Sequence, residues 1–315
     1  MMSNGAAFDS AGQKQITFKK RVGLFGATSL VGQCLLPLLK QNGWQVRAFS
    51  RRLISNNDQN VQWIQIKNPG DNPETFAGEM EQVDFWICVA SVWILPDYFP
   101  MLEAHGARRV IAVSSTSRFT KNDSSASDEQ VTAQKLSEGE DSLQTWARIK
   151  GVDWVILRPT LIYGLGQDKN ISELIRLIRR LGFFPLAGQA KGLRQPVHAE
   201  DVAAACLSAL EKSNVVNRSY NLSGGETLTY REMIHRLFAA LGLRPRIITV
   251  PLWLFGMAAA GIRCFPRYRH WTAQMAERMN ANLVFDHAEA VRDINFSPRK
   301  FQLTSKDLPS EGGLS

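Results

Sequence analysis

The chain alternates short apolar runs with segments that carry apolar residues at helical spacing. Such runs predict buried strands, and the helical spacing predicts amphipathic helices. The predicted strands cover 20–25, 44–50, 61–67, 83–90, 109–113 and 151–157, and the first predicted helix covers 30–41. Because the run at 83–90 is almost entirely apolar, we expect a sheet that is buried on both faces. This alternation predicts an α/β fold with a doubly wound parallel sheet.

The second half of the chain is less regular. It predicts a basic amphipathic helix at 171–181, a helix at 201–210, a late strand at 218–222, a helix from a capping box at 229–232 to 240, and further helices from Arg246 on. We predict four parts. They are a disordered lead-in (1–18), a first domain built on the parallel sheet (19–165, with a late strand returning near 196–223), a smaller and mainly helical lobe (166–302), and a tail (303–315).

A glycine-containing turn follows the first predicted strand and opens the first helix. Gly26 allows a tight turn, and Gly32 lets the helix pack close to the strand. The N–H groups at the start of such a helix bind a pyrophosphate. The middle glycine of the usual pattern is Ser29. A purely structural turn is the alternative, but the strand–turn–helix context favours a dinucleotide site formed by Gly26, Ala27, Thr28, Ser29, Leu30, Val31 and Gly32.

Two arginines follow the second predicted strand. Arg51 and Arg52 stand where an acidic residue binds the ribose hydroxyls in NAD-selective sites, and 44–57 contains no Asp or Glu. Arginine fits the 2′-phosphate of NADP, so we predict NADP rather than NAD; solvated surface charges are the alternative. The residues that end later strands complete the predicted cofactor site: Ala90, Ser91, Ser114 and Pro159.

The net charge of +8 suits an anionic ligand, a nucleic acid or an acidic membrane surface. No basic run with interleaved aromatic residues supports nucleic acid. The four cysteines are far apart and show no metal-ligand spacing, which predicts reduced thiols in a cytoplasmic protein and no metal site. The apolar run at 251–262 is too short to span a membrane. We interpret it as a helix over the substrate cleft, and membrane-surface contact through the arginines that follow is the alternative.

Six stretches together resemble the extended and atypical short-chain dehydrogenase/reductase superfamily, in its NAD(P)-dependent epimerase/dehydratase branch. They are G-A-T-S-L-V-G from Gly26, V-D-F-W-I-C-V-A from Val83, V-I-A-V-S-S-T-S from Val110, L-R-P-T-L-I-Y-G from Leu157, Q-P-V-H-A-E-D-V from Gln195 and Y-N-L-S-G-G-E from Tyr220. The resemblance implies a Rossmann-type lobe, a smaller C-terminal substrate lobe and a cleft between them. The chain is also similar to the complex I accessory subunit of this superfamily, which binds NADPH.

The chain departs from this family at the catalytic position. Family enzymes place Ser or Thr after the fifth strand and a Y-x-x-x-K pair on the next helix, where the tyrosine is the general acid/base. Ser115 or Thr116 matches the first position, and Lys135 is the best candidate for the lysine, but Val131 stands four residues before it. By this resemblance Lys135 is also a candidate cofactor-binding residue that would hold the nicotinamide ribose, and a solvated helix lysine is the alternative. Tyr163 is a candidate replacement for the missing acid, although by family analogy it is usually structural.

These features predict an NADP-binding oxidoreductase or epimerase-like enzyme that acts on a small substrate, either a nucleotide sugar or an apolar carbonyl compound. Ser115 would orient the reacting oxygen. The alternative is a non-catalytic NADPH-binding assembly or redox-sensing protein, which the missing tyrosine supports. His198, in the stretch from Gln195, is expected more often to be a packed or hydrogen-bonding residue than a base.

Overall fold

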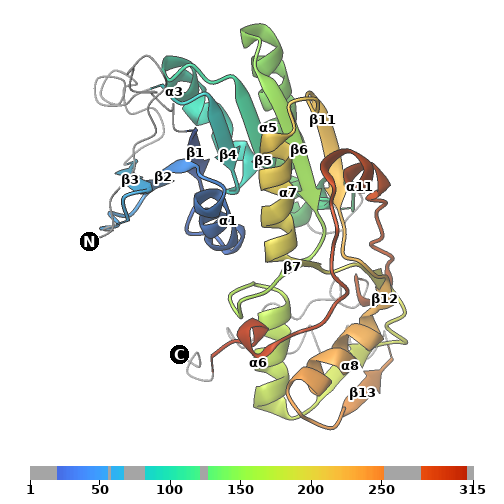
Figure 1. Cartoon of the computed structure of the whole chain (residues 1–315). Helices are drawn as coiled ribbons and strands as arrows, with labels where there is room; N and C mark the ends of the chain where they lie inside the picture. The colour runs from blue at the N-terminus through green and yellow to red at the C-terminus, as the bar shows by residue number, and fades with distance from the viewer. Residues whose placement is uncertain (1–19, 56–57, 67–81, 121–126, 252–277, 311–315) are drawn as a thin grey trace, which may run out of the picture.

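The computed structural model describes residues 20–55, 58–66, 82–120, 127–251 and 278–310. Its centre is a seven-stranded sheet with the order β11-β6-β5-β4-β1-β2-β3, in which every pairing is parallel (Figure 1). The strands are β1 (Arg21–Phe25), β2 (Gln45–Ser50), β3 (Val61–Gln65), β4 (Phe85–Cys88), β5 (Arg109–Val113), β6 (Asp153–Pro159) and β11 (Arg218–Leu222). The predicted doubly wound α/β fold is confirmed.

Helices cover both faces of the sheet. The helices α1 (Leu30–Gln41) and α7 (Ala199–Glu211) pack on one face together with α11 (Ala288–Ile294). The opposite face carries η1 (Val92–Tyr98), α3 (Phe99–Ala104) and α5 (Ser127–Lys150). Successive strand residues alternate between the two cores: Ile87 lies in the first, and Trp86 and Cys88 lie in the second. This burial on both sides explains why the central strands are almost entirely apolar.

A second lobe has its own core. It contains α6 (Ile171–Leu181), α8 (Tyr230–Ala240) and the paired short strands β8 (Phe184–Ala187) with β13 (Ile247–Val250), and β9 (Leu193–Arg194) with β12 (Leu228–Thr229). The strands β7 (Ile162–Tyr163) and β10 (Val197–His198) pair with each other as the chain leaves the large sheet. The segment after Arg246, which we expected to be helical, therefore begins with a strand.

The chain after residue 296 is not a free tail in its described part. Phe301 is fully buried against the second lobe, and Asp307, in η3 (Ser305–Asp307), is 4% exposed. In Figure 1 this segment runs from α11 beside the large sheet down to α6 in the second lobe. The predicted tail at 303–315 is thus corrected for residues 303–310, because these residues bury side chains that the sequence pattern did not reveal. The predicted lead-in and most of the apolar run at 251–262 lie outside the described residues.

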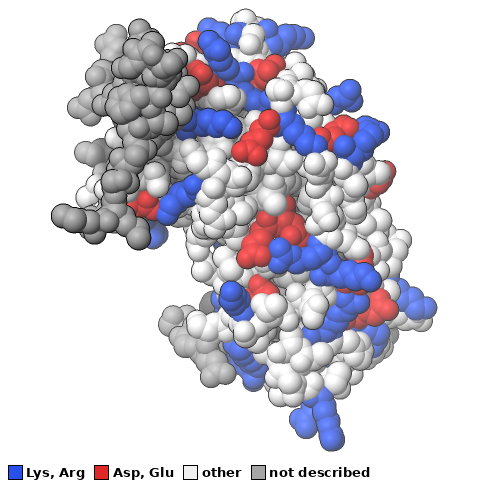
Figure 2. Space-filling model, viewed as in Figure 1, with Lys and Arg blue, Asp and Glu red and all other residues white. Residues whose placement is uncertain are grey.

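Charged side chains are mixed on the molecular face that Figure 2 draws. Lys and Arg are interspersed with Asp and Glu over both lobes, and the described residues on this face form no continuous basic surface. Among the described helices, none is long and apolar enough to span a membrane.

Candidate functional site

The predicted dinucleotide turn lies where the sheet changes winding direction. Strands β4 and β2 flank β1, so the loop after β1 opens at the carboxyl edge between the two halves of the sheet. In doubly wound folds, ligands bind at this switch point. We call residues Gly26–Gly32 the glycine turn.

Two glycines give this turn its shape. Gly26 has a φ of +80°, and a Cβ there would lie 2.6 Å from the backbone nitrogen of Ala90. A Cβ at Gly32 would lie 2.2 Å from the carbonyl oxygen of Gly26. Helix α1 therefore approaches the end of β1 too closely for any side chain at these positions. Thr28 is exposed in this turn, and α1 begins directly after it. In doubly wound folds the N–H groups at such a helix start bind a pyrophosphate.

Ser29 replaces the middle glycine and caps α1. Its Oγ accepts a hydrogen bond from the N–H of Gly32 at 3.1 Å, and its own N–H donates to the carbonyl of Gly26 at 2.8 Å. Serine is among the best N-cap residues because it satisfies an otherwise unpaired helix N–H. The departure from the glycine pattern thus has a local structural reason.

The other predicted cofactor residues lie along the same edge of the sheet. Arg51 and Arg52 are exposed directly after β2, and the carbonyl of Arg51 accepts a hydrogen bond from Gln65 at 3.2 Å. Ala90 is half-buried and Ser91 is exposed after β4. Two positively charged side chains are therefore free to contact a phosphate beyond the end of β2.

A buried ionic cluster occupies the neighbouring edge, after β5 and β6. Glu140, on α5, is 0% exposed and accepts a hydrogen bond from Ser114 Oγ at 2.5 Å. Arg158 Nη2 donates to it at 2.6 Å and Arg158 Nε at 3.1 Å, and Arg118 Nη1 donates to the same carboxylate. We call Ser114, Arg118, Glu140 and Arg158 the glutamate cluster. Two guanidinium groups face one carboxylate, so the cluster has an excess of one positive charge.

An aromatic ring lies over the cluster. The guanidinium carbons of Arg118 and Arg158 lie 5.4 and 5.2 Å from the ring centre of Phe119, within the range of cation–π contacts. Phe119 is itself 49% exposed and approaches Phe285 of the C-terminal segment. The arginine pair is therefore held rigidly below a partly exposed aromatic surface.

The two predicted hydroxyl candidates differ in their environment. Thr116 is buried, and its Oγ1 donates to the carbonyl of Pro159 at 3.3 Å. Ser115 is half-buried, and its Oγ accepts a hydrogen bond from the N–H of Ser117 at 3.1 Å. Ser115 is thus the better placed of the two to contact a substrate. Pro159, predicted to contact the cofactor, is a buried residue at the end of β6.

Lys135 and Tyr163 lie in very different surroundings, and neither makes a hydrogen bond to Ser115 among the contacts of the described residues. Lys135 is exposed on α5, beside the buried Leu136. Tyr163 is fully buried with its ring edge-on to His198 and Phe301, and burial raises its pKa to about 12. A proton donor has to reach the substrate oxygen. Tyr163 has the position of a core residue, and we do not give it a catalytic role.

Glu140 is the site residue that the sequence analysis missed. The buried residues of α5 recur at intervals of three and four, and Glu140 lies among them: Ala133, Leu136, Glu140, Leu143 and Ala147. A charged residue on the buried stripe of a helix requires a partner. This pattern could have identified Glu140, although not the arginines that neutralise it.

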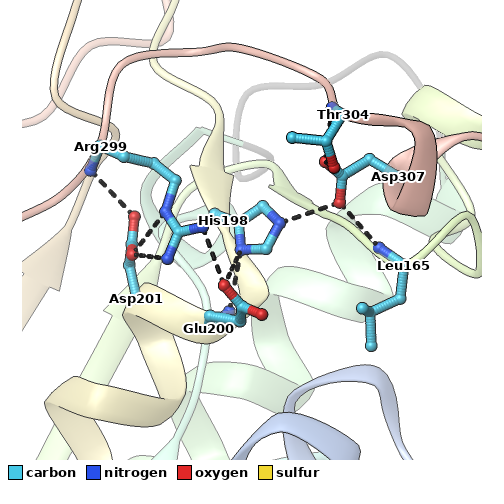
Figure 3. A network of polar contacts seen from close by, with 7 residues as sticks. All are labelled: Leu165, His198, Glu200, Asp201, Arg299, Thr304 and Asp307. Carbon is cyan, nitrogen blue, oxygen red and sulfur yellow. Dashed lines mark hydrogen bonds and ion pairs between the residues drawn. The ribbon is translucent and has the colours of Figure 1, made fainter.

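His198 belongs to a polar network at the start of α7, which Figure 3 shows from close by. Its Nε2 lies 3.0 Å from Asp307 Oδ1, and its Nδ1 accepts the N–H of Glu200 at 3.2 Å. Arg299 donates through Nε to Asp201 at 2.9 Å and through Nη1 to Glu200 at 2.8 Å. His198 thus has the hydrogen-bonding role that its position in the sequence favoured.

Comparison with known proteins agrees with this geometry. A model of the NAD dependent epimerase/dehydratase family matches residues 99–223, which run from α3 to the end of β11. The match covers less than half of the chain. The resemblance predicted from the sequence is confirmed.

Three curated relatives span different activities. The chain is 26% identical over 119 residues to UDP-glucose 4-epimerase of Vibrio cholerae, and 29% identical over 97 residues to the mitochondrial NADH dehydrogenase (ubiquinone) 1 alpha subcomplex subunit 9 of Arabidopsis thaliana. These matches cover 38% and 30% of this chain, and only 36% and 24% of the two relatives. A broader match, at 25% identity, covers 70% of this chain and 76% of 2-alkyl-3-oxoalkanoate reductase of Stenotrophomonas maltophilia.

Solved structures confirm the fold over nearly the whole chain. UDP-glucuronic acid 4-epimerase of Bacillus cereus, crystallised with NAD, has a TM-score of 0.67 at 14% identity. The alignment covers 91% of this chain and 95% of that one. At this identity the similarity establishes the architecture of both lobes and leaves the substrate to chemical argument.

Proposed function

We propose that this protein binds NADP(H) at the glycine turn and acts as an oxidoreductase or epimerase-like enzyme on a small molecule. The observation that carries the proposal is the position of the glycine turn, which lies at the switch point of the sheet and leads directly into the N-terminus of α1. Ala90 and Ser91 extend the same edge.

The preference for NADP rests on Arg51 and Arg52. Both side chains are exposed after β2 and available for a 2′-phosphate, which guanidinium groups bind through paired hydrogen bonds. Titration of the pure protein with NADPH and NADH, followed by nucleotide fluorescence, tests this point. We expect saturable binding of NADPH and weaker binding of NADH; absence of binding by both would refute the proposal.

The chemistry would take place beside the glutamate cluster. A bound nicotinamide supplies or accepts a hydride. Ser115 would hold the reacting oxygen, and the excess positive charge of Arg118 and Arg158 would favour an oxygen that carries negative charge. The relatives support two substrate classes, nucleotide sugars and oxo-alkanoates, in agreement with the nucleotide sugar or carbonyl compound expected from the sequence.

The alternative is a protein that keeps NADPH as a structural or sensing ligand. One observation favours it: the carboxylate of Glu140, paired with Ser114 and Arg158, lies in the cluster that adjoins Ser115, and α5 carries no tyrosine. The similarity to a complex I subunit agrees with this alternative. A panel of sugars and carbonyl compounds incubated with bound NADPH separates the two functions. Oxidation of NADPH by any member supports the enzyme, and its retention throughout supports the alternative.

The proposal also covers the kind of ligand that the protein binds and the compartment in which it works. We propose a small-molecule substrate rather than a nucleic acid, since the basic side chains in Figure 2 are interspersed with acidic ones. The free thiols of Cys34, Cys88 and Cys206 support a reducing compartment such as the cytoplasm. Contact with a membrane surface stays the alternative for the run at 251–262.

A further inference from the structure

The C-terminal segment Thr304–Leu308, which we call the strap, is centred on the buried carboxylate of Asp307. Asp307 Oδ2 accepts hydrogen bonds from the N–H and the hydroxyl of Thr304, both at 2.8 Å. Its Oδ1 accepts the N–H of Leu165 at 3.1 Å (Figure 3). One side chain thus closes the strap on itself and ties it to the loop after β7.

His198 supplies the fourth donor to Asp307. Because His198 Nδ1 accepts the N–H of Glu200, its hydrogen is on Nε2, which donates to Asp307 Oδ1 at 3.0 Å. Burial by itself would raise the pKa of Asp307, but the hydrogen bonds from His198, Thr304 and Leu165 outweigh burial and hold this pKa well below its usual range. The carboxylate is therefore a persistent anionic anchor between α7 and the strap.

The strap fixes the conformation of the loop at residues 164–167. Leu165 has a φ of +53°, in the left-handed region that side chains with a Cβ rarely adopt, and the bond to Asp307 holds its N–H in this orientation. A Cβ at Gly166 would lie 2.5 Å from the carbonyl oxygen of Leu308. The loop therefore lies so close to the strap that no side chain fits at Gly166.

The same loop contacts the helix that begins at the glycine turn. Gln167 Oε1 accepts a hydrogen bond from Gln33 Nε2 at 2.9 Å, and the same amide nitrogen of Gln33 donates to the carbonyl of Thr28 at 3.2 Å. Gln33 lies on α1, and Thr28 lies inside the glycine turn. A continuous series of contacts thus connects the strap with the residues proposed to bind the pyrophosphate.

We propose that Asp307 is a positioning residue for the dinucleotide site, acting through the loop at 164–167 and Gln33. This inference rests on the proposed NADP(H) binding, but on no catalytic step. The strap would hold the first turn of α1 in its binding geometry before the nucleotide arrives, and such pre-organisation raises affinity because less ordering remains to be done.

A double-mutant cycle on the full-length protein tests this connection. In Asp307→Asn, one acceptor oxygen becomes an N–H₂ group that faces existing donors, and Gln33→Ala breaks the contact at the other end. We expect each variant to bind NADPH more weakly, Asp307→Asn by about tenfold, as for loss of one charge-assisted hydrogen bond. The double variant should bind no more weakly than Asp307→Asn alone, because both changes break one connection.

Asp293→Asn provides the matched control. Asp293 also accepts a hydrogen bond from a largely buried side chain, Tyr220, at 3.0 Å, but it lies on α11 beside β11. NADPH affinity should stay within about twofold of the wild type in this variant. Amide exchange adds a second readout: in Asp307→Asn we expect faster exchange at 164–167 and in the glycine turn.

The outcomes separate the two claims. If the wild type binds no NADPH, the proposed function and this inference both fail. If the wild type binds but Asp307→Asn keeps its affinity, or if the two losses simply add, only the inference is overturned. Should Asp307→Asn not fold, Thr304→Val removes a single hydroxyl donor to the same carboxylate, and unchanged NADPH affinity in this milder variant would overturn the inference equally.

Discussion

The glycine turn and the glutamate cluster lie on the same edge of one sheet and are built in opposite ways. The turn is formed by backbone geometry, with Gly26 and Gly32 packed too closely for a Cβ. The cluster is formed by side chains from three separate elements that meet at Glu140. The first keeps the family's outer glycines, and the helix that carries Glu140 in the second lacks the family's tyrosine. The comparison indicates that the proposed dinucleotide binding and the family's proton transfer would depend on separate parts of this fold.

The largest expected effect is a loss of folding stability when the glutamate cluster is broken. Glu140→Ala leaves two arginines facing a buried space without a counter-charge, and breaking such a buried pair costs about 3–5 kcal/mol of folding free energy. Glu138→Ala, on the exposed side of the same helix, should change stability by less than about 0.5 kcal/mol. Urea unfolding of both variants measures this difference. Equal stabilities would mean that the cluster does not support the fold.

The next effect concerns the turn. Gly26→Ala places a Cβ against the backbone of Ala90 at a φ of +80°, and we expect NADPH affinity to fall by about a hundredfold. Gly43→Ala is the control, because Gly43 has a φ of +79°, a Cβ there would meet no atom within 4 Å, and the residue lies beyond the far end of α1. Calorimetric titration compares the two. A similar loss in both variants would show that backbone strain alone, and not the close approach, governs binding.

A smaller effect tests the cofactor preference. Replacing Arg51 and Arg52 together by alanine should weaken NADPH binding by about tenfold while leaving NADH binding nearly unchanged. The same replacement at the exposed Arg244 and Arg246 removes equal charge in the second lobe and should alter neither affinity. An equal loss for both nucleotides in the first variant would contradict the NADP assignment.

The smallest effect concerns Ser29. Ser29→Ala removes the N-cap of α1 and should lower stability by about 1 kcal/mol, whereas Ser29→Gly should lower it by only a few tenths. Chemical denaturation measures both values. If the glycine variant were as unstable as the alanine variant, Ser29 would stabilise the fold through a contact other than its N-cap hydrogen bond.

Features that depend on residues close together in the chain were predicted from the sequence, and features that depend on distant contacts were not. Helix α6 and strand β11 have the bounds that periodicity gave, and Thr229 and Glu232 form the predicted capping box. Each of these depends on residues close together in the chain. Glu140 and Asp307 depend on partners far away in sequence. The pattern of α5 could show that Glu140 is buried, but no pattern within one segment shows which groups bind either carboxylate. The strap was therefore misjudged as a tail.

The most direct test of the central claim is a crystal structure of the protein with NADPH. The account predicts that the pyrophosphate lies against the N–H groups of the glycine turn, with the 2′-phosphate within hydrogen-bond reach of Arg51 or Arg52 and the nicotinamide directed toward Ser115. A nucleotide bound elsewhere, or a pyrophosphate that does not contact the start of α1, would contradict it.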